Sequence, residues 1–534
     1  MGIFNIFSKG EKRSSKGGKR GFSFGQMGSR PLSGGSNSGF LGAVQDRLTD
    51  DFIGSELSAD ASAFNSMDKL RARARQLYMS NPYASRYINM VVAQTLGMDG
   101  IKFEAQTKQD NGELDLVDNQ RLELAWKDFS KSKNCSITGK SSMLDIQRLA
   151  LSTMARDGEV LIRVHSKVDA KYGICLEVLE GDYLLTQYNE TIANGGRIRM
   201  GIEQDKYGKP IAYHLAVVSP SDAILGGVGS FNQGSVETVR VPAEEIIHLY
   251  MQDRPEQSRG ITWLAQSMRA MHMTEAYREA ELVNARVSAS KMAFYTSTDG
   301  DGYTGDDMDD EGNLIFEAEA GMIEQLPKGV GLETLDWGSP NSGVGDFVKS
   351  SLRGVSAGLN VSYNGLSNDL EGVNFSSIRA GVQDERENWK FIQSFLSEHL
   401  MTPLYDAWLD SAILVDAVPF PPRKIEKFRD IVWRPRGFGY VDPAKDNQAF
   451  GKAIQLGIMS RTEIASSQGK DFKDVLAQLA EEEKQAYSLG VNISPVQTMP
   501  IYPAMPDPEN QAKGEFGEPE EEEIVEKIEV DKED

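Results

Sequence analysis

The chain has 534 residues and a mass of 58.9 kDa, more than one ordinary hydrophobic core accommodates, so several structural regions are expected. Its formal charge of −22 and its pI near 4.8 exclude a protein that grips nucleic acid over its whole surface, because phosphate binding needs clustered Lys and Arg. No apolar run is long enough to span a bilayer, so no membrane partner is expected.

Residues 1–59 are rich in Gly, Ser, Lys and Arg, which predicts a basic disordered arm. The short apolar patch Ile3–Phe7 precedes the basic residues, whereas an export signal has them first. The only cysteines, Cys135 and Cys175, are far apart in sequence, so we interpret them as reduced, half-buried side chains rather than a structural disulfide. These features indicate an intracellular origin.

The segment 60–260 is predicted to be an α+β domain, with helices first and a mostly antiparallel sheet after them. Apolar residues recur at helical spacing from Ala63 to Leu96, with a break at Asn81-Pro82, and again from Leu144 to Ala155. Runs of β-branched residues bounded by turn residues predict the strands Gly158–Val164, Ile174–Leu179, Ile198–Glu203, Ile211–Val218 and Glu245–Tyr250.

A long helix is predicted from Ile261 to about Ser290. Two buried stripes are expected on it, first Leu264, Met268 and Met271, and then Ala276, Ala280, Val283 and Val287. The offset between the stripes indicates that the helix changes neighbours midway. A small β-rich insert follows, from Lys291 to about Leu335, and contains the acidic glycine loop Asp299–Gly312.

The segment 361–377 is rich in glycine and asparagine and lies between two amphipathic helical patterns. The apolar residues at helical spacing are Val348, Leu352, Val355 and Leu359 before it, and Phe375, Ile378, Val382, Trp389, Ile392 and Leu396 after it. Gly365 and Gly372 relax the backbone, and Asn374 with Ser376 is placed to cap the following helix. We expect a mobile tongue on two packed helices, suited to gating rather than to chemistry. An ordinary surface loop between two core helices is the alternative.

The C-terminal part begins with proline-rich connections beyond Ala412, and a helical region is predicted from Asp442 to about Leu489. The chain then becomes proline-rich from Pro495 and strongly acidic near its end. Residues 491–534 are therefore expected to form a disordered acidic tail.

Motifs for catalysis and metal binding are absent or incomplete. Gly139-Lys140-Ser141 resembles the end of a phosphate-binding loop, but Asn134 stands where the required glycine belongs. The acidic segment from Asp307 begins like a calcium loop, yet Ala318 occupies the position of the closing bidentate Glu. The histidines are not at metal-ligand spacing. The sequence therefore predicts no enzyme activity, no cofactor and no metal site.

A series of short segments follows in a fixed order over roughly residues 60 to 490. They are Arg71-Ala-Arg-Ala-Arg75, Asn81-Pro-Tyr-Ala-Ser-Arg86, Arg156-Asp-Gly-Glu-Val160, Leu179-Glu-Gly-Asp182, Gly201-Ile-Glu-Gln-Asp205, Gly208-Lys-Pro210, Val241-Pro-Ala-Glu-Glu-Ile-Ile-His248, Arg254-Pro-Glu-Gln-Ser-Arg-Gly260, Leu366-Ser-Asn-Asp369, Asn374-Phe-Ser-Ser-Ile-Arg379 and Asp442-Pro-Ala-Lys445. In this order they resemble the portal proteins of tailed bacteriophages, specifically the lambda-type portal family.

The resemblance implies an α+β portal-type subunit that assembles with its own copies into a ring, usually of twelve, at one capsid vertex. The implied regions are a wing at 60–260, a first stem helix at 261–293, a β-rich clip at 294–343, a second stem helix at 344–360, a tunnel loop at 361–377, a long helix returning to the wing at 378–441 and a helical crown at 442–490. The two tails are poorly shared with the family, so they receive no role from it.

The resemblance also implies a function, in which double-stranded DNA is packaged and ejected through the ring. The implied partners are this DNA, the terminase large subunit, the major capsid and scaffold proteins, and the head-completion or tail connector proteins. The subunit would be made in the host cytoplasm and located at the portal vertex of the virion. The tunnel-loop residues expected near the DNA are Tyr363, Asn364, Ser367, Asn368, Asp369, Glu371 and Asn374. An acidic chain suits such a channel, because a deep electrostatic well would stall a polyanion.

Two other functions stay open from the residues alone. A packaging-associated ATPase or nuclease would need an intact phosphate loop or a metal-binding carboxylate cluster. Another capsid component, such as a scaffold or shell protein, would be mostly helical and elongated or would form closed shells. The strand-rich middle of the chain argues against a scaffold.

Overall fold

The computed structural model describes residues 56–167, 169–192, 195–217, 237–289, 293–297, 330–334, 343–371, 375–439 and 443–491. Most of the predicted N-terminal arm, the acidic tail from residue 492, the calcium-like loop, and the loop positions Gly372 and Asn374 lie outside these ranges, as does the side chain of Ser376. No helix in the described ranges is both long and apolar enough to cross a bilayer.

Helices and strands account for most of the described chain. The helices are α1 (Ala59–Ser80), α2 (Pro82–Thr95), α3 (Leu116–Phe129), α4 (Ser132–Cys135), α5 (Met143–Asp157), α6 (Met268–Ala289), α7 (Val344–Gly358), α8 (Tyr363–Ser367), α9 (Phe375–Leu396), α10 (Thr402–Leu414), α11 (Pro443–Gln455), α12 (Arg461–Ser467) and α13 (Phe472–Ser488). The strands are β1 (Lys102–Ala105), β2 (Glu159–Ser166), β3 (Ile174–Glu180), β4 (Glu190–Thr191), β5 (Arg197–Arg199), β6 (Ile202–Gln204), β7 (Pro210–Ala216), β8 (Thr238–Pro242), β9 (Ile246–Tyr250), β10 (Ala293–Ser297), β11 (Val330–Thr334) and β12 (Ile431–Arg434). The 3-10 helices are η2 (Gly181–Tyr183), η5 (Ala243–Glu245) and η7 (Pro422–Arg429), and η6 (Ser397–Met401) is a short π-helix.

The strands form four sheets, and their pairings are antiparallel throughout the described chain. A three-stranded sheet has the order β3-β2-β9, a five-stranded sheet has the order β4-β5-β6-β7-β8, and the pairs β1-β12 and β10-β11 stand apart. Helices precede the two larger sheets along the chain. The predicted α+β class, with an antiparallel sheet, is therefore confirmed.

Helix α2 begins where the proline pattern predicted a break. The side chain of Asn81 accepts hydrogen bonds from the backbone N–H groups of Tyr83 and Ala84 at 3.0 and 3.1 Å. Pro82 occupies the first turn, where its missing N–H costs no helical bond. Helix α5 similarly begins at a capping box formed by Ser142 and Asp145.

The single strand predicted at Ile198–Glu203 is wrong, because this segment is a hairpin of β5 and β6. Met200 and Gly201 form its two-residue turn with φ angles of 46° and 84°. A tight hairpin turn of this type requires positive φ at both central positions. Gly201 takes that conformation without strain, but Met200 gives no sign of a turn by its residue type.

The long helix predicted from Ile261 begins later, at Met268. The backbone of Ile261 and Thr262 lies against Gly158, and the N–H of Trp263 donates to the carbonyl of Ala155 at 3.1 Å. These contacts hold the chain in turns up to residue 267, so helical geometry starts only after them.

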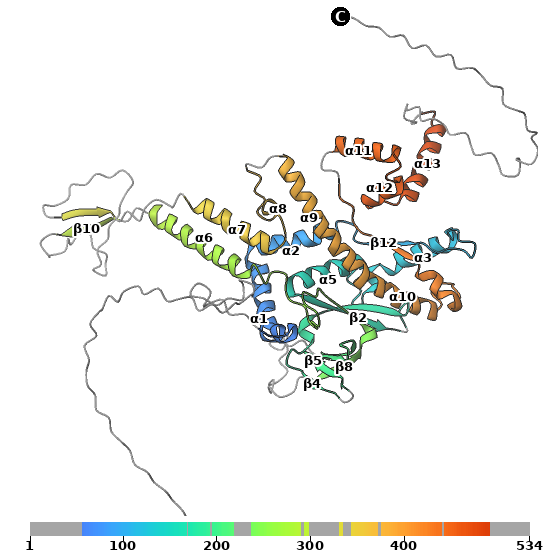
Figure 1. Ribbon diagram of the computed structural model, residues 1–534, viewed down its shortest axis with the longest axis horizontal. Coiled ribbons are helices and arrows are strands. Elements are labelled where there is room, and N and C mark those ends of the chain that lie inside the picture. The colour runs from blue at the N-terminus through green and yellow to red at the C-terminus, as the bar shows by residue number, and fades with distance from the viewer. Residues whose placement is uncertain are drawn as a thin grey trace, which may run out of the picture. The chain divides into compact units, whose positions relative to one another are not determined.

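The second stripe predicted on this helix is not buried at its described positions, and the side chain of Val287 lies outside the described residues. Leu264, Met268 and Met271 of the first stripe are at most 6% exposed, whereas Ala276 and Ala280 are exposed and Val283 is 51% exposed. Helix α6 lies side by side with α7 and contacts little else beyond its first turns (Figure 1). The apolar pattern is thus present, but within one chain nothing in the described residues covers it.

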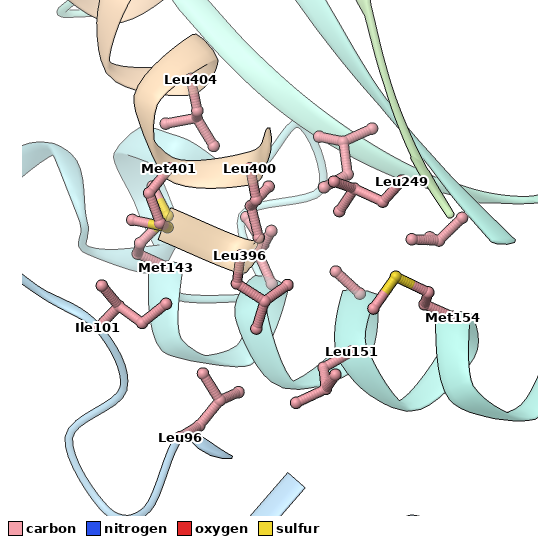
Figure 2. Close-up of a cluster of buried hydrophobic side chains, with 14 of the residues drawn as sticks. Leu96, Ile101, Met143, Leu151, Met154, Leu249, Leu396, Leu400, Met401 and Leu404 are labelled. Atoms are coloured by element: carbon pink, nitrogen blue, oxygen red, sulfur yellow. The ribbon is translucent and has the colours of Figure 1, made fainter. Parts of the chain in front are cut away.

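The main core joins segments from distant parts of the chain (Figure 2). Its labelled members come from the end of α2, the segment between α2 and β1, α5, β9, α9, η6 and α10, and are Leu96, Ile101, Met143, Leu151, Met154, Leu249, Leu396, Leu400, Met401 and Leu404. The connection between α9 and α10 is a π turn, in which Thr402 Oγ1 donates to the carbonyl of Ser397 at 2.9 Å. Pro403 follows and has no N–H to continue the α-helical ladder.

Both cysteines are free and fully buried rather than half-buried, with 0% exposure for Cys135 and 4% for Cys175. The N–H of Ile137 donates to the carbonyl of Leu176 at 3.0 Å, which brings the segments that carry the two cysteines together. Burial raises the pKa of the Cys135 thiol to about 12.

The C-terminal helical region is confirmed as α11, α12 and α13. Among its described residues only Ala486 is buried, whereas Leu476, Leu479 and Leu489 are half or more exposed. These three helices therefore draw little stability from burial within one chain.

Candidate functional site

The first half of the predicted tongue is packed onto the body, not held as an open loop. Helix α8 begins at Ser362, whose Oγ accepts a hydrogen bond from the N–H of Gly365 at 3.1 Å. Leu366 is only 2% exposed and anchors the segment in the main core. Gly365 thus lies inside a helix, and the left-handed turn falls on Asn368, with φ 56°.

Beyond α8 the chain is tied to α7 by charge and hydrogen bonds. Tyr363 Oη donates to Asp369 Oδ2 at 2.8 Å, and Lys349 Nζ lies 3.7 Å from Asp369 and 3.0 Å from Glu371. The guanidinium of Arg353 lies over the ring of Tyr363, 5.6 Å from its centroid. A backbone hydrogen bond, Tyr363 and Lys349 together lower the pKa of Asp369. We call Lys349, Tyr363, Asp369 and Glu371 the loop clasp.

The structure brings together several of the predicted site residues. Tyr363, Asp369 and Glu371 meet in the loop clasp, and Ser367 supports it, since Ser367 Oγ accepts from the N–H of Asp369 at 3.2 Å. Asn368 and Glu371 are exposed, and Asn364 is half-buried on α8. Asn374 lies outside the described residues. The described residues of this predicted site are polar and charged, and none of their contacts joins a nucleophile to a general base.

A second cluster of polar side chains lies in the α+β domain. In it, a fully buried carboxylate accepts hydrogen bonds from two arginines and one histidine. Glu159, at the start of β2, is 0% exposed. Its oxygens accept from Arg71 at 2.6 Å, from Arg259 at 2.8 and 2.9 Å, and from His248 at 3.1 Å. The backbone N–H of Gly260 adds a bond at 3.2 Å.

Electrostatics keep this buried carboxylate ionised. Burial alone would raise the pKa of Glu159, but Arg259, His248 and Arg71 hold it well below its usual range. Arg259 is itself 0% exposed and also donates to the carbonyls of Gly181 and Met200, at 2.9 and 2.7 Å. A buried charge of this kind persists only when it is paired and hydrogen-bonded.

Further ion pairs extend the network towards the surface. Asp182 in η2 pairs with Arg71 at 2.6 Å and also with Arg75. Asp157 at the end of α5 pairs with Arg75 at 2.8 Å and with Arg156 at 2.7 Å. We call this set, centred on Glu159, the buried ion network. It joins α1, α5, β2, η2, β9 and the segment around Arg259.

The buried ion network is built from the segments that carried the family resemblance. These segments are scattered over almost two hundred positions of sequence but share one cluster of contacts. They contribute Arg71 and Arg75 of α1, the Arg156–Glu159 run, Asp182, His248 and Arg259-Gly260. Their chemistry is structural, because the donors and acceptors satisfy each other. Among the described residues no cluster of His, Cys, Asp and Glu could hold a metal ion.

Sequence comparison places these motifs in a known family. Residues 45–393 match the family described as phage portal protein, lambda family. The chain belongs to the lambda family of phage portal proteins. A curated relative, the probable portal protein of Halomonas phage phiHAP-1, is 34% identical over 459 residues, covering 85% of this chain and 87% of that protein. The suspected family is thereby confirmed.

More distant portal proteins match over nearly the same length. The portal protein of Escherichia phage N15 is 20% identical, covering 82% of this chain and 87% of its own length. Portal protein B of Escherichia phage lambda is also 20% identical, covering 81% and 87%. The chain is accordingly a portal protein, a structural component of the phage particle rather than an enzyme.

Solved structures give weaker matches. Chains from the neck of an empty gene transfer agent particle and from the neck of a native one are 14% and 13% identical, with TM-scores of 0.43 and 0.41. They cover 78% and 74% of this chain and 94% and 93% of their own. The family assignment rests on the sequence matches.

The motifs of this portal protein do not reveal by sequence alone that they meet in one ion network. The signal that could have shown it is charge placed beside apolar strand residues, as in Glu159 before Val160, Leu161 and Ile162. A charged residue that opens a buried strand needs buried partners of opposite sign. The rejection of the phosphate loop, by contrast, is consistent with the structure, because Gly139 and Lys140 lie in a turn between two helices and not between a strand and a helix.

Proposed function

We propose that copies of this chain form a closed ring, with twelve as the expected number, at one capsid vertex, and that double-stranded DNA is packaged and ejected through its channel. The observation that carries the proposal is the match of residues 45–393 to the portal family. In this ring, residues 60–260 form the wing, α6 and α7 the stem, the β10–β11 region the clip, and α11 to α13 the crown. The terminase large subunit and later the connector proteins dock on the clip, while capsid and scaffold proteins surround the ring.

Exposed apolar side chains on the stem helices support assembly. Leu282 and Val283 on α6 are 60% and 51% exposed, and Phe347 on α7 is 52% exposed. Apolar surface gathered on two packed helices is typical of a surface that a partner covers. A neighbouring copy in a ring presents a different face of the same chain to this one, which makes the contact heterologous and closing.

The loop clasp supports a position beside the DNA. Asp369 and Glu371 carry negative charge, and Lys349 neutralises part of it at 3.7 and 3.0 Å. A segment with this balance repels a polyanion weakly and offers hydrogen-bonding tips without a deep well. We therefore assign residues 361–377 to the tunnel loop, with Tyr363 and Asn368 among the groups nearest the DNA.

Single-particle electron microscopy of the purified full chain tests the assembly. End-on views of closed rings with an axial hole wide enough for duplex DNA are the expected result, and their symmetry gives the subunit number. Monomers or closed shells would contradict the proposal.

Neutralising the loop carboxylates tests their position. The double variant Asp369→Asn/Glu371→Gln removes two negative charges and frees Lys349 from both partners. We expect rings to form as before and to bind a short duplex severalfold more tightly at low salt. The matched control is Asp110→Asn/Glu426→Gln, two carboxylates that are 93% and 83% exposed elsewhere on the chain. Equal changes in the two double variants would contradict a loop that faces DNA.

A further inference from the structure

Two arginines meet over one aromatic ring between β12 and α11. Arg386 belongs to α9, and Arg436 and Phe438 belong to the segment that leads from β12 to the C-terminal helices. The guanidinium carbons of Arg386 and Arg436 lie 5.3 and 5.5 Å from the centroid of the Phe438 ring. We call these two arginines with Phe438 the arginine pair.

The backbone around the arginine pair is held in place by α9. Arg386 Nη2 donates to the carbonyl of Gly439 at 2.8 Å, and Gln393 Nε2 donates to the carbonyl of Arg436 at 3.0 Å. Arg436 in turn donates through Nη1 to the carbonyl of Ala93 near the end of α2. The two guanidiniums are therefore positioned by bonds from both sides rather than free to swing apart.

Neither guanidinium has a carboxylate partner within ion-pair distance in the described residues, although the neighbouring arginines do. Arg379 pairs with Asp446 at 2.6 Å, and Arg434 pairs with Glu104. Each member of the arginine pair uses one hydrogen bond to a backbone carbonyl, out of the five N–H donors that a guanidinium carries. Most of their hydrogen-bonding capacity is thus unused by the described protein.

The pairing of two like charges has a cost that the fold does not offset. Both side chains are half-buried, and burial together with Arg436 lowers the pKa of Arg386. Among the described residues, the carboxylate that acts on Arg386 is Asp446, and it is held by Arg379. In a chain with a formal charge of −22, a half-buried cationic pair that has no carboxylate within ion-pair distance among the described residues is a place where an anion gains more than elsewhere on the surface.

We propose that the arginine pair binds phosphate groups of the duplex DNA backbone. Guanidinium groups match phosphate oxygens in a bidentate geometry, and each guanidinium over Phe438 makes one hydrogen bond within the described protein, so further N–H donors remain for a phosphate. This site rests on the proposed DNA channel and deepens it, since it names a contact that is attractive while the loop clasp is weakly repulsive.

The salt dependence of DNA binding tests this site. Rings of the full chain are titrated with a short fluorescent duplex between about 50 and 200 mM salt, and the slope of log affinity against log salt is measured. The double variant Arg386→Gln/Arg436→Gln should reduce the slope by about two for each subunit whose pair contacts the duplex, close to one for each phosphate that is no longer neutralised. For each such subunit, the affinity deficit relative to the unmodified chain should then shrink about tenfold across this salt range.

The matched control is Arg121→Gln/Arg240→Gln, which removes the same charge from arginines that pair with Asp118 and Glu203. An unchanged slope in the first double variant, or an equal change in both, would overturn the site while leaving the channel intact. Rings that fall apart only in the first variant would show that the arginine pair neutralises a carboxylate of a neighbouring copy, and would also overturn it. Failure of the unmodified chain to form rings would instead contradict the proposed function.

Discussion

Replacing Glu159 by Gln should destabilise the fold by about 3–5 kcal/mol, the usual cost of breaking a buried ion pair from one side. The substitution keeps the shape of the side chain but removes its charge. It leaves Arg71 and Arg259, which are 3% and 0% exposed, without their shared counterion. It also turns one acceptor into an NH2 donor that faces other donors, because both oxygens of Glu159 accept hydrogen bonds.

Urea unfolding of the full chain, followed by circular dichroism, measures this loss. The control is Glu387→Gln, where the carboxylate is 71% exposed and its partner Lys390 lies one turn away, and here a change within about 0.5 kcal/mol is expected. A loss below about 1 kcal/mol for Glu159→Gln would refute the reasoning, since Arg259 is fully buried and, among the described residues, has Glu159 as its carboxylate partner, whereas Arg71 keeps Asp182.

A triple variant separates the cost of breaking the network from its net contribution. Arg71→Met/Glu159→Leu/Arg259→Met removes the central charges together and fills the space with apolar groups of similar length. Replacing a whole buried triad in this way often costs little, because the desolvation penalty disappears with the charges. We expect the triple variant to lose less stability than Glu159→Gln alone, a non-additivity that independent sites would not show.

Four further predictions concern single positions. Burial lowers the pKa of His248, so the unfolded chain takes up the proton first. Stability should fall as the pH drops below about 6.5, and His248→Gln should flatten that dependence in urea unfolding at several pH values. The Cys135 thiol, buried and with its pKa raised to about 12, should not react with a thiol reagent at pH 8 until the chain unfolds, and rapid labelling of native protein would contradict its placement. Gly158→Ala should cost more than about 1 kcal/mol, because φ is 99° and a Cβ would meet the backbone of Ile261 at 2.5 Å. Gly451→Ala, in open space on α11, should stabilise by up to about 1 kcal/mol in the same assay.

Apolar periodicity and the residues that cap or break helices predicted much of the fold, because those signals are local. The break at Asn81-Pro82 and the apolar spacing around Trp389 each follow from a few neighbouring residues. The hairpin at Met200 was missed for the opposite reason: positive φ at a non-glycine residue is imposed by strand pairing and not by the residue itself. Strand β12, likewise, pairs with β1 across more than three hundred positions, a pairing that no local window contains.

In the candidate site, too, the local features were predictable and the long-range contacts were not. The composition of residues 361–377 predicted a polar segment between helices, and the structure bears out the flanking helices. It could not predict the loop clasp, because Lys349 belongs to the preceding helix and its partners follow only after the chain has turned back on itself. Leu366, which fixes α8 to the core, is 2% exposed, whereas Leu370 in the same loop is 63% exposed, and no periodicity in this segment marks which of the two is buried.

The exposed second stripe of α6 is the feature that most directly relates the sequence to the proposed assembly. A helix pattern states which face is apolar, but it does not state which molecule covers that face. In this chain Leu264, Met268 and Met271 are covered from within, whereas Val283 is not, although both stripes follow the same spacing. In the proposed ring, the change of neighbours along the helix, expected from the offset of the stripes, is a change from contacts inside one chain to contacts with another copy. A charged substitution such as Val283→Glu should therefore leave the urea midpoint of the monomer unchanged and abolish rings in electron micrographs. A monomer that unfolds more easily would show that this face is covered within the chain after all.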